Sequence, residues 1–295
     1  MQIETPVVTQ LIDVPLGCGE GPCWSAAEGV LWFVDIPGPT LFRYDPATKD
    51  LQRFAMPSAI GSFGLVPDGR LVVALKHGIH FFDPKSGKLE FLVHPEADIP
   101  GNRYNDGKIG PDGCFWVGSM DDRPGDKEPT AALYRIDIKG RCDKVLTGLT
   151  VSNGLAWTPD GRTMYHSDSR QRFVQTFDFD ARTGALANGK RIRMLEEQDG
   201  RPDGAACDAE GHYWSAGVSA GVLNRIAPDG TIVRKIAMPA AAPTMPCFAG
   251  LGLKTLYVTS LATDRLGPKQ FGTLMVLDVG VAGAPIARFG EPLAL

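Results

Sequence analysis

Short apolar runs separated by turn sequences recur along the whole chain. In the clearest form, a turn with Asp-Gly or Glu-Gly joins two apolar runs, which predicts a β-hairpin. Such strings are VPDGRLVVAL from residue 66, GPDGCFWVGS from 110, TPDGRTMYHS from 158 and DAEGHYWSAG from 208, with looser matches in SAAEGVLWFV from 25 and AGLGLKTLYV from 249. The turn glycines are Gly29, Gly69, Gly113, Gly161 and Gly211, and a sixth turn lies near Leu253. The unit therefore repeats every 40 to 50 residues.

A second hairpin follows the first in each unit. It is visible as FRYDPATKDLQRF, HFFDPKSGKLEFL, LYRIDIKGRCDKV, QTFDFDARTGALA and NRIAPDGTIVRKI, and the last unit ends more irregularly with LMVLDVGVAGAPIARF. Two hairpins per unit make a four-stranded antiparallel sheet, and six such sheets predict an all-β, six-bladed β-propeller. We expect residues 1–295 to form one domain and VVTQLIDV, near the N-terminus, to close the ring with the last blade.

Two other all-β architectures fit the repeat less well. A pair of β-sandwiches would not require the same two hairpins six times, and a parallel β-helix would need a shorter repeat. No segment has a sustained apolar period of 3.6 residues, so almost no helix is expected.

Composition excludes several kinds of partner. The formal net charge of −4 is spread without a basic stripe, which argues against nucleic acid. No apolar run approaches the roughly 18 residues of a membrane helix, and the N-terminus lacks the pattern of an export signal. The six cysteines form no C-x-x-C pair, as expected for reduced thiols in a cytoplasmic protein.

Oxygen-bearing side chains recur at one phase of the repeat. Asn105, Asn153 and Asp203 each lie eight residues before a hairpin glycine, and Glu20 lies nine before. Equivalent places on innermost strands surround the central channel at one end, so we expect these side chains to converge. Each is followed within two residues by glycine, and the alternative interpretation is an ordinary turn dipeptide.

Two inward carboxylates together with amide oxygens would repel or remain unpaired without a cation. One bound divalent ion resolves this, and all-oxygen ligands favour calcium, magnesium or manganese. Zinc and iron(II) stay open.

Other polar residues are predicted at the same rim. Arg103 and Arg201 precede Asn105 and Asp203 by two residues, and further candidates on the second strands are Lys76, His77, Asp121, Asp168 and Ser219. Polar groups around a metal suit a hydroxyl-rich ligand, although a solvated rim position is the alternative for Arg201, Asp168 and His77. The histidines His80, His94, His166 and His212 are expected to be structural.

Five strings together resemble the gluconolactonase, regucalcin (senescence marker protein) and luciferin-regenerating enzyme family. They are CGEGPCW from residue 18, NRYNDGKIGPDGCFWVGSM from 102, SNGLAWTPDGRTMYHSDS from 152, RPDGAACDAEGHYW from 201 and PTMPCFAG from 243. The resemblance implies a metal held by Glu20, Asn153 and Asp203, with Asp203 also linked to activating water. It further implies substrate contacts from Arg103 and Asn105, and places the family's third-blade carboxylate, often glutamate, on Asp121. We expect Asp121 to bind substrate by accepting hydrogen bonds from sugar hydroxyls.

These residues predict a metal-dependent hydrolase that opens a sugar lactone to the aldonic acid in carbohydrate catabolism. The metal would polarise the carbonyl and acidify water, Asp203 would act as general base, and Arg103 would stabilise the developing negative charge. The alternatives are another ester or organophosphate hydrolase on the same scaffold, or a non-catalytic calcium-binding propeller. The natural aldonolactone, the metal in the cell and the oligomeric state stay open.

Overall fold

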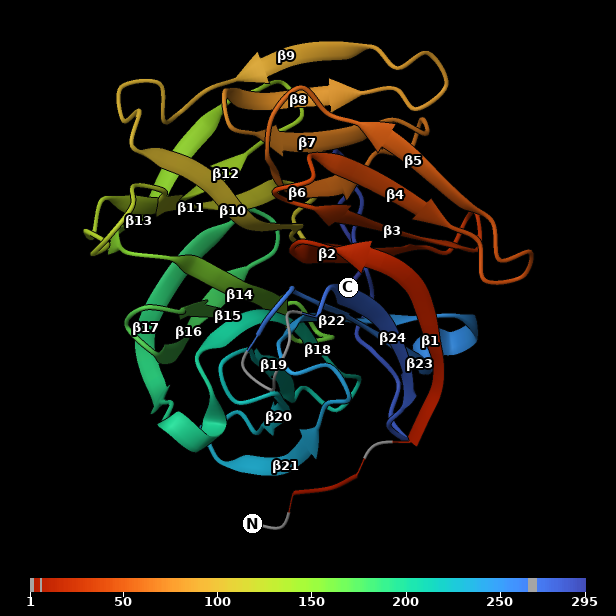
Figure 1. Ribbon diagram of the computed structural model, residues 1–295. Coiled ribbons are helices and arrows are strands. Elements are labelled where there is room, and N and C mark those ends of the chain that lie inside the picture. Colours follow the sequence, from red (N-terminus) through yellow and green to blue (C-terminus); the bar gives the residue numbers. More distant parts are fainter. Residues whose placement is uncertain (1–2, 6, 265–269) are drawn as a thin grey trace.

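Six four-stranded antiparallel sheets stand in a ring around a central channel in the computed structural model, which describes residues 3–5, 7–264 and 270–295 (Figure 1). The first three blades are β2 (Gly19–Ser25), β3 (Val30–Asp35), β4 (Thr40–Tyr44) and β5 (Leu51–Ala55); β6 (Ile60–Leu65), β7 (Leu71–Leu75), β8 (Gly78–Phe82) and β9 (Leu89–Val93); and β10 (Asn102–Ile109), β11 (Phe115–Asp121), β12 (Ala131–Ile136) and β13 (Cys142–Leu149). The next two are β14 (Ser152–Trp157), β15 (Thr163–Asp168), β16 (Phe173–Asp180) and β17 (Ala185–Met194); and β18 (Pro202–Cys207), β19 (Tyr213–Gly217), β20 (Val222–Ile226) and β21 (Ile232–Ala237). The predicted six-bladed propeller is confirmed.

The N-terminal strand closes the ring, as predicted. The sixth blade contains β22 (Pro243–Ala249), β23 (Thr255–Ser260) and β24 (Gly272–Asp278), and its outermost strand is β1 (Val7–Leu16). In this pairing Val7 lies opposite Asp278, and Leu11 lies opposite Met275. The only helical turns in the described residues are η1 (Glu197–Asp199) and η2 (Leu251–Leu253). None of the described helical segments is long or apolar enough to span a bilayer.

The hairpin between the first two strands of each blade lies at the distal end of the channel. Gly29, Gly69, Gly113, Gly161 and Gly211 all have positive φ, between 64° and 90°. This left-handed conformation is accessible to glycine at little cost, which explains the Asp-Gly and Glu-Gly turns of the repeat. The opposite end of the channel, where the innermost strands begin, is called the mouth below.

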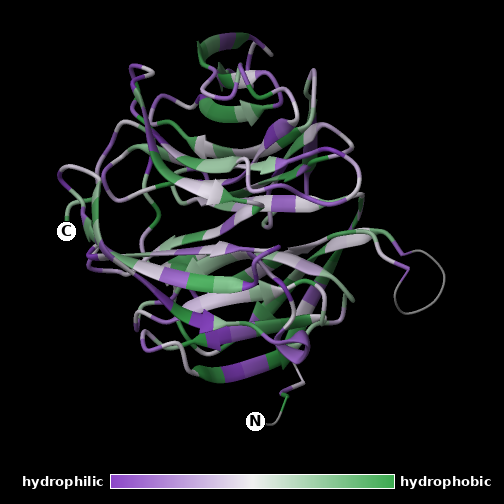
Figure 2. Ribbon diagram, turned by 90° about the vertical axis from the view of Figure 1, so that its left-hand side faces the viewer, coloured by the Kyte–Doolittle hydropathy of each residue, from purple (hydrophilic) through white to green (hydrophobic). Residues whose placement is uncertain are grey.

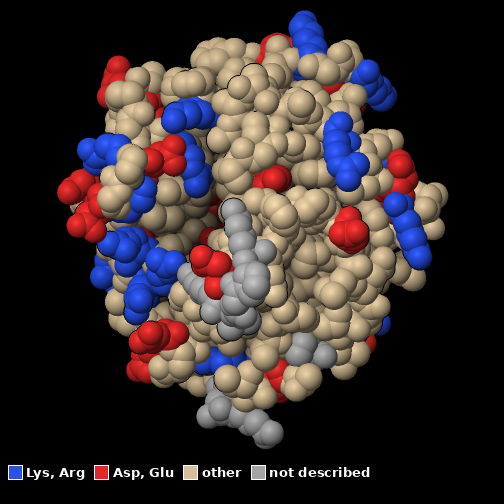
Figure 3. Space-filling model, in the orientation of Figure 1, with Lys and Arg blue, Asp and Glu red and all other residues tan. Residues whose placement is uncertain are grey.

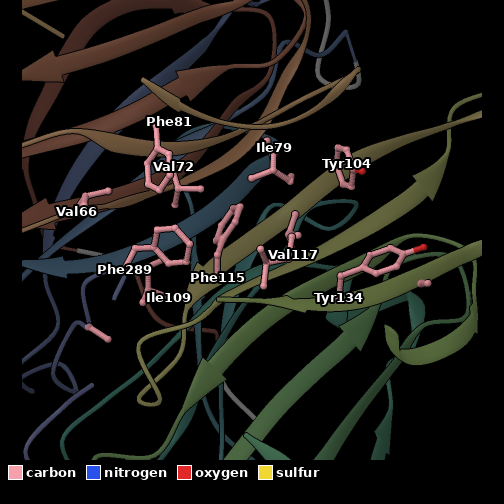
Figure 4. Packing of buried hydrophobic residues seen from close by; sticks show 14 residues of the cluster. Val66, Val72, Ile79, Phe81, Tyr104, Ile109, Phe115, Val117, Tyr134 and Phe289 are labelled. Atoms are coloured by element: carbon pink, nitrogen blue, oxygen red, sulfur yellow. The ribbon is translucent and has the colours of Figure 1, made fainter. Parts of the chain in front are cut away.

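Apolar side chains fill the wedges between neighbouring blades. The wedge between the second and third blades contains Val72, Phe81, Phe115 and Tyr134, together with Phe289 from the C-terminal segment (Figure 4). Polar residues gather on outer strands and loops (Figure 2). Interlocking wedges hold each blade against its neighbours, so the channel keeps a fixed shape.

The C-terminal segment, residues 283–295, crosses the distal face. The irregular string at the end of the sixth unit therefore contributes only β24 to its blade, and β1 takes the place of a second strand from this string. The backbone N–H groups of the C-terminal segment at 284, 289 and 290 donate to the carbonyls of Cys207 (2.9 Å), Leu65 (2.8 Å) and Gly113 (2.8 Å). It thus touches the fifth, second and third blades. In the side view of Figure 2 the C-terminus lies at the left, on this face.

Three alternate blades share a side-chain triad of an acid, a tryptophan and an arginine near the distal hairpin. In the fifth blade Asp208 accepts from Trp214 Nε1 (2.8 Å) and Arg225 Nε (2.7 Å). The equivalents are Asp112, Trp116 and Arg135 in the third blade and Glu28, Trp32 and Arg43 in the first. The triad ties the hairpin to the second and third strands of its blade.

Candidate metal centre and active site

A β-bulge interrupts each innermost strand beside the candidate site residues. The pairing register shifts between Glu20 and Cys23 in the first blade and between Asn153 and Ala156 in the fourth. Gly154, within the second bulge, has φ of 66°, and a Cβ there would lie 2.0 Å from Tyr213 Oη. The Asn-Gly string is therefore a bulge that aims a side chain and not a hairpin turn, since bulges commonly re-aim residues at active sites.

A hydrogen-bond chain joins the third, fourth and fifth blades across the mouth. Arg103 Nη1 donates to Asn105 Oδ1 (2.9 Å), and Asn105 Nδ2 donates to Asn153 Oδ1 (3.1 Å). Asn153 Nδ2 then donates to Asp203 Oδ1 (2.8 Å). The structure thus brings together four of the predicted site residues.

Glu20 reaches the same place from the first blade. It is 7% exposed, and its Oε2 accepts from the N–H of Gly21 (2.9 Å). Burial, and then the negative charges of Asp203 and Asp106, raise the pKa of Glu20 well above its ordinary value. Burial, and then Asp106, likewise raise the pKa of Asp203 to about 7. The mouth therefore holds carboxyl groups that repel one another.

This donor set fits a hard divalent cation. In the described part of the chain no three His, Cys, Asp or Glu side chains are grouped for metal binding, so an ion here needs the amide oxygen of Asn153 beside Glu20 and Asp203. Asn153 Oδ1 has one lone pair engaged by Asn105, and an amide oxygen has two. A cation would remove the carboxylate repulsion and use oxygen ligands of the kind that calcium and magnesium prefer.

Asp106 is a site residue that the sequence reasoning missed. It is 4% exposed, its Oδ2 accepts from the N–H of Leu155 (3.2 Å), and its Oδ1 has no hydrogen-bond partner. Asn105 beside it also turns toward β14, where its Nδ2 donates to the carbonyl of Ser152 (3.0 Å). Strand alternation would send neighbours to opposite faces, but the bulge here turns both toward the fourth blade. The Asn105-Asp106 string was the available signal.

Asp121, predicted to accept hydrogen bonds from substrate hydroxyls, does not join the hydrogen-bond chain at the mouth. It is fully buried, and its two oxygens accept four hydrogen bonds. Arg123 donates three of them, from its backbone N–H, Nε and Nη2 (2.9–3.0 Å), and the N–H of Glu128 donates the fourth (2.8 Å). The hydrogen bonds from Arg123 hold the pKa of Asp121 far below its ordinary value. Each Asp121 oxygen thus accepts two hydrogen bonds, and Asp121 anchors the loop after β11.

The next residue, Asp122, is the carboxylate that meets Arg103. Asp122 Oδ1 accepts from Arg103 Nε (3.1 Å), and Asp122 Oδ2 lies 3.5 Å from Lys76 Nζ. Lys76 is therefore part of the mouth, as predicted, whereas the neighbouring His77 is exposed.

The remaining rim candidates have different environments. Asp168 is fully buried and accepts from four backbone N–H groups, at 150, 151, 170 and 171, so it holds loops together. Ser219 Oγ accepts from the N–H of Arg201 (2.7 Å), and the charge of Arg201 offsets part of the rise in the pKa of Asp203 that burial and Asp106 cause. In the space-filling view, charged side chains of both signs gather over the third and fourth blades at the left (Figure 3).

His166 is structural, as expected. Its Nε2 lies 2.9 Å from Ser152 Oγ and its Nδ1 lies 3.0 Å from Gln175 Nε2. Ser152 and His166 are both fully buried, and burial lowers the pKa of His166 to about 3. This Ser–His pair is closed to substrate.

The raised pKa of Asp203 predicts that the chelator-treated protein loses stability as the pH rises. The pKa of Asp203 is about 7 in the folded chain and about 3.8 in the unfolded chain. The contribution of Asp203 to the free energy of unfolding is therefore complete below pH 3.8 and is lost as the pH rises through about 7. The slope is at most about 1.4 kcal/mol per pH unit for one proton. Urea unfolding of the wild type and Asp203→Asn, both treated with chelator, gives the difference in free energy of unfolding. That difference should fall across this window, and a flat difference would contradict the pKa.

The fold and the mouth define a class of protein: a six-bladed propeller with repelling carboxyl groups, an amide bridge and an arginine at one end of its channel. Comparison with known proteins agrees. Residues 18–262 match the family model described as the SMP-30/gluconolactonase/LRE-like region. The chain belongs to this family, as its sequence strings indicated.

Relatives and solved structures of several kinds are similar to this chain. A 6-deoxy-6-sulfogluconolactonase from Pseudomonas putida is 36% identical, over 85% of this chain and 86% of that protein. Regucalcin from Xenopus laevis is 34% identical, over 92% of this chain and 95% of that one. The crystal structure of a calcium-binding protein, regucalcin, from Agrobacterium tumefaciens superposes with a TM-score of 0.90 at 28% identity, covering 98% and 99% of the two chains. A luciferin-regenerating enzyme gives a TM-score of 0.88 at 28% identity, covering 98% and 100%.

Proposed function

We propose that the protein is a metal-dependent lactonase that opens a sugar lactone to the aldonic acid. The observation that carries the proposal is the hydrogen-bond chain that ends on Asp203, beside the buried carboxyl of Glu20. A relative named 6-deoxy-6-sulfogluconolactonase supports the substrate class. The six cysteines are all free, which supports a reducing compartment such as the cytoplasm. The name of the same relative supports a role in carbohydrate catabolism.

Glu20, Asn153 and Asp203 would hold one divalent ion. When bound, the ion supplies Lewis acidity to the lactone carbonyl and lowers the pKa of nearby water. Calcium, magnesium, manganese, zinc and iron(II) are the candidates, and the all-oxygen ligand set favours the first three.

Side chains of the protein itself would transfer the proton, stabilise the developing charge and orient the substrate. Asn153 holds one oxygen of Asp203, which orients the carboxylate to take the proton of the attacking water. The water oxygen bonds to the carbonyl carbon, the ring C–O bond breaks, and the proton passes from Asp203 to the leaving alkoxide. Arg103 stabilises the negative charge on the carbonyl oxygen during the attack. Asn105 orients substrate and keeps the Asn153 amide in place.

Removal of the metal tests this proposal directly. Chelation should lower lactone hydrolysis by about 100-fold or more, and a divalent ion should restore it, because carbonyl polarisation of this kind is worth that much in rate. The assay compares hexono- and pentonolactones with an aryl ester and an organophosphate. Unchanged hydrolysis after verified metal removal would contradict metal dependence. A preference for the aryl ester or organophosphate would favour the alternative hydrolase.

A calcium-binding protein without catalysis is the second candidate, because the similar Agrobacterium structure carries that description and the ligand set is all oxygen. It predicts calcium binding with no hydrolysis of any lactone under any divalent ion. Calorimetry together with the same substrate panel separates the two functions.

A further inference from the structure

We propose that Asp122 is a positioning residue that fixes Arg103 at the channel mouth, and that Lys76 completes this clamp from the neighbouring blade. The inference rests on the proposed lactonase function, since it concerns how Arg103 is held for catalysis. The three residues are called the Lys76–Asp122–Arg103 clamp.

The clamp fixes two edges of the Arg103 guanidinium. Nε donates to Asp122 Oδ1 (3.1 Å), and Nη1 donates to the carbonyl of Tyr104 (2.8 Å) and to Asn105 Oδ1 (2.9 Å). None of these bonds uses Nη2, which remains the nitrogen for a lactone oxygen. The Arg103 side chain is 16% exposed, so it is enclosed yet open to a ligand.

Lys76 determines which oxygen of Asp122 faces Arg103. Its Nζ lies 3.5 Å from Asp122 Oδ2, on the oxygen that Arg103 does not use. Lys76 directly follows β7 in the second blade, whereas Asp122 directly follows β11 in the third. The clamp therefore spans two blades.

The loop geometry explains why Asp122 can do this. Asp121, one residue earlier, is locked by Arg123 and by the N–H of Glu128. This anchor fixes the end of β11, so Asp122 leaves a rigid strand end and not a free loop.

The clamp contributes little to the free energy of unfolding. Asp122 and Lys76 are 35% and 41% exposed, and ion pairs of that exposure contribute little to folding. Its effect is instead geometric. An arginine side chain has high rotamer freedom, and misplacing a catalytic group by about 1 Å can cost about 100-fold in rate.

Asp122→Asn tests the role because it keeps the size and removes the charge. We expect kcat on the best lactone to fall about 10- to 100-fold, with metal affinity unchanged and KM changed less than kcat. Asp122→Glu should recover part of the loss, and Lys76→Met should give a smaller loss. The matched control is Asp126→Asn in the same loop, whose carboxylate is 99% exposed and pairs with Arg170 at 3.3 Å. This variant should keep wild-type kcat.

A double-mutant cycle isolates the path through Arg103. If Asp122 acts only by holding Arg103, Asp122→Asn should have no further effect on kcat in an Arg103→Met background. An equal loss in both backgrounds would overturn the positioning role, as would wild-type kcat in Asp122→Asn.

A second readout does not depend on activity. The Nε–H signal of Arg103 in a ¹⁵N NMR spectrum should be resolved and slow to exchange in the wild type and Asp126→Asn, and lost in Asp122→Ala, which has no acceptor for Nε. An unchanged signal in Asp122→Ala would overturn the clamp. If the wild type hydrolyses no lactone, the proposed function fails, whereas the NMR comparison still decides whether the clamp exists.

Discussion

Asp203→Asn is expected to lower kcat for lactone hydrolysis by about 100- to 10,000-fold, the range found when a general base is removed. The substitution keeps the size of the side chain but takes away both the proton acceptor and the negative charge beside Glu20. It should also weaken metal binding, so kcat is measured at saturating metal, with occupancy checked by elemental analysis.

Asn105→Ala is the matched comparison. Asn105 donates to Asn153 Oδ1 and supports the chain, but it does not take a proton in the proposed reaction. Its loss should therefore be smaller than that of Asp203→Asn. Wild-type turnover in metal-loaded Asp203→Asn would remove Asp203 from the mechanism.

Asp208→Ala should have the largest effect on folding, with a loss of about 3–5 kcal/mol in the free energy of unfolding. Asp208 is fully buried, and its removal leaves Trp214 Nε1, Arg225 Nε and the backbone N–H groups at 210 and 212 without their acceptor. Arg225, whose side chain is 15% exposed, keeps an ion pair with Glu210, which is 63% exposed. Urea unfolding followed by tryptophan fluorescence measures the change.

The control for Asp208→Ala is built into the repeat. Glu28 occupies the same place in the first blade, but its side chain is 44% exposed and its bonds to Trp32 and Arg43 are longer, at 3.3 Å and 3.4 Å. Glu28→Ala should cost at most about 1 kcal/mol, as exposed pairs do. Equal losses in the two variants would show that burial does not set the value of the triad.

The repeat made the fold and much of the mouth predictable from sequence. A fixed distance from a hairpin glycine is a fixed height on an innermost strand, so Asn105, Asn153 and Asp203 could be placed together by counting. Glu20 needed one extra residue, which the SAAEG turn absorbs.

The roles of Asp106 and Asp122 could not be predicted from the repeat, because they depend on local departures from it. Asp106 reaches the fourth blade because a bulge cancels strand alternation. Asp122, and not Asp121, contacts Arg103 because the side chain of Arg123 folds back onto Asp121 after the end of β11. No periodicity encodes that contact.

The C-terminal segment also sets an order for folding during synthesis. The ring of Phe289 packs against the rings of Phe81 and Phe115, with centroid distances of 5.8 Å and 6.4 Å. In the sequence, Phe289 follows both residues by more than half the length of the chain. The sixth blade likewise needs β1 and β24 together. A nascent chain can therefore form hairpins and single blades on the ribosome. It can close the ring only after β24 has emerged, and it can finish the wedge between the second and third blades only after Phe289 has emerged. A chain that terminates before β24 would expose apolar surface both in the sixth blade and in the wedge that Phe289 fills. Such exposed surface makes incomplete chains prone to aggregation.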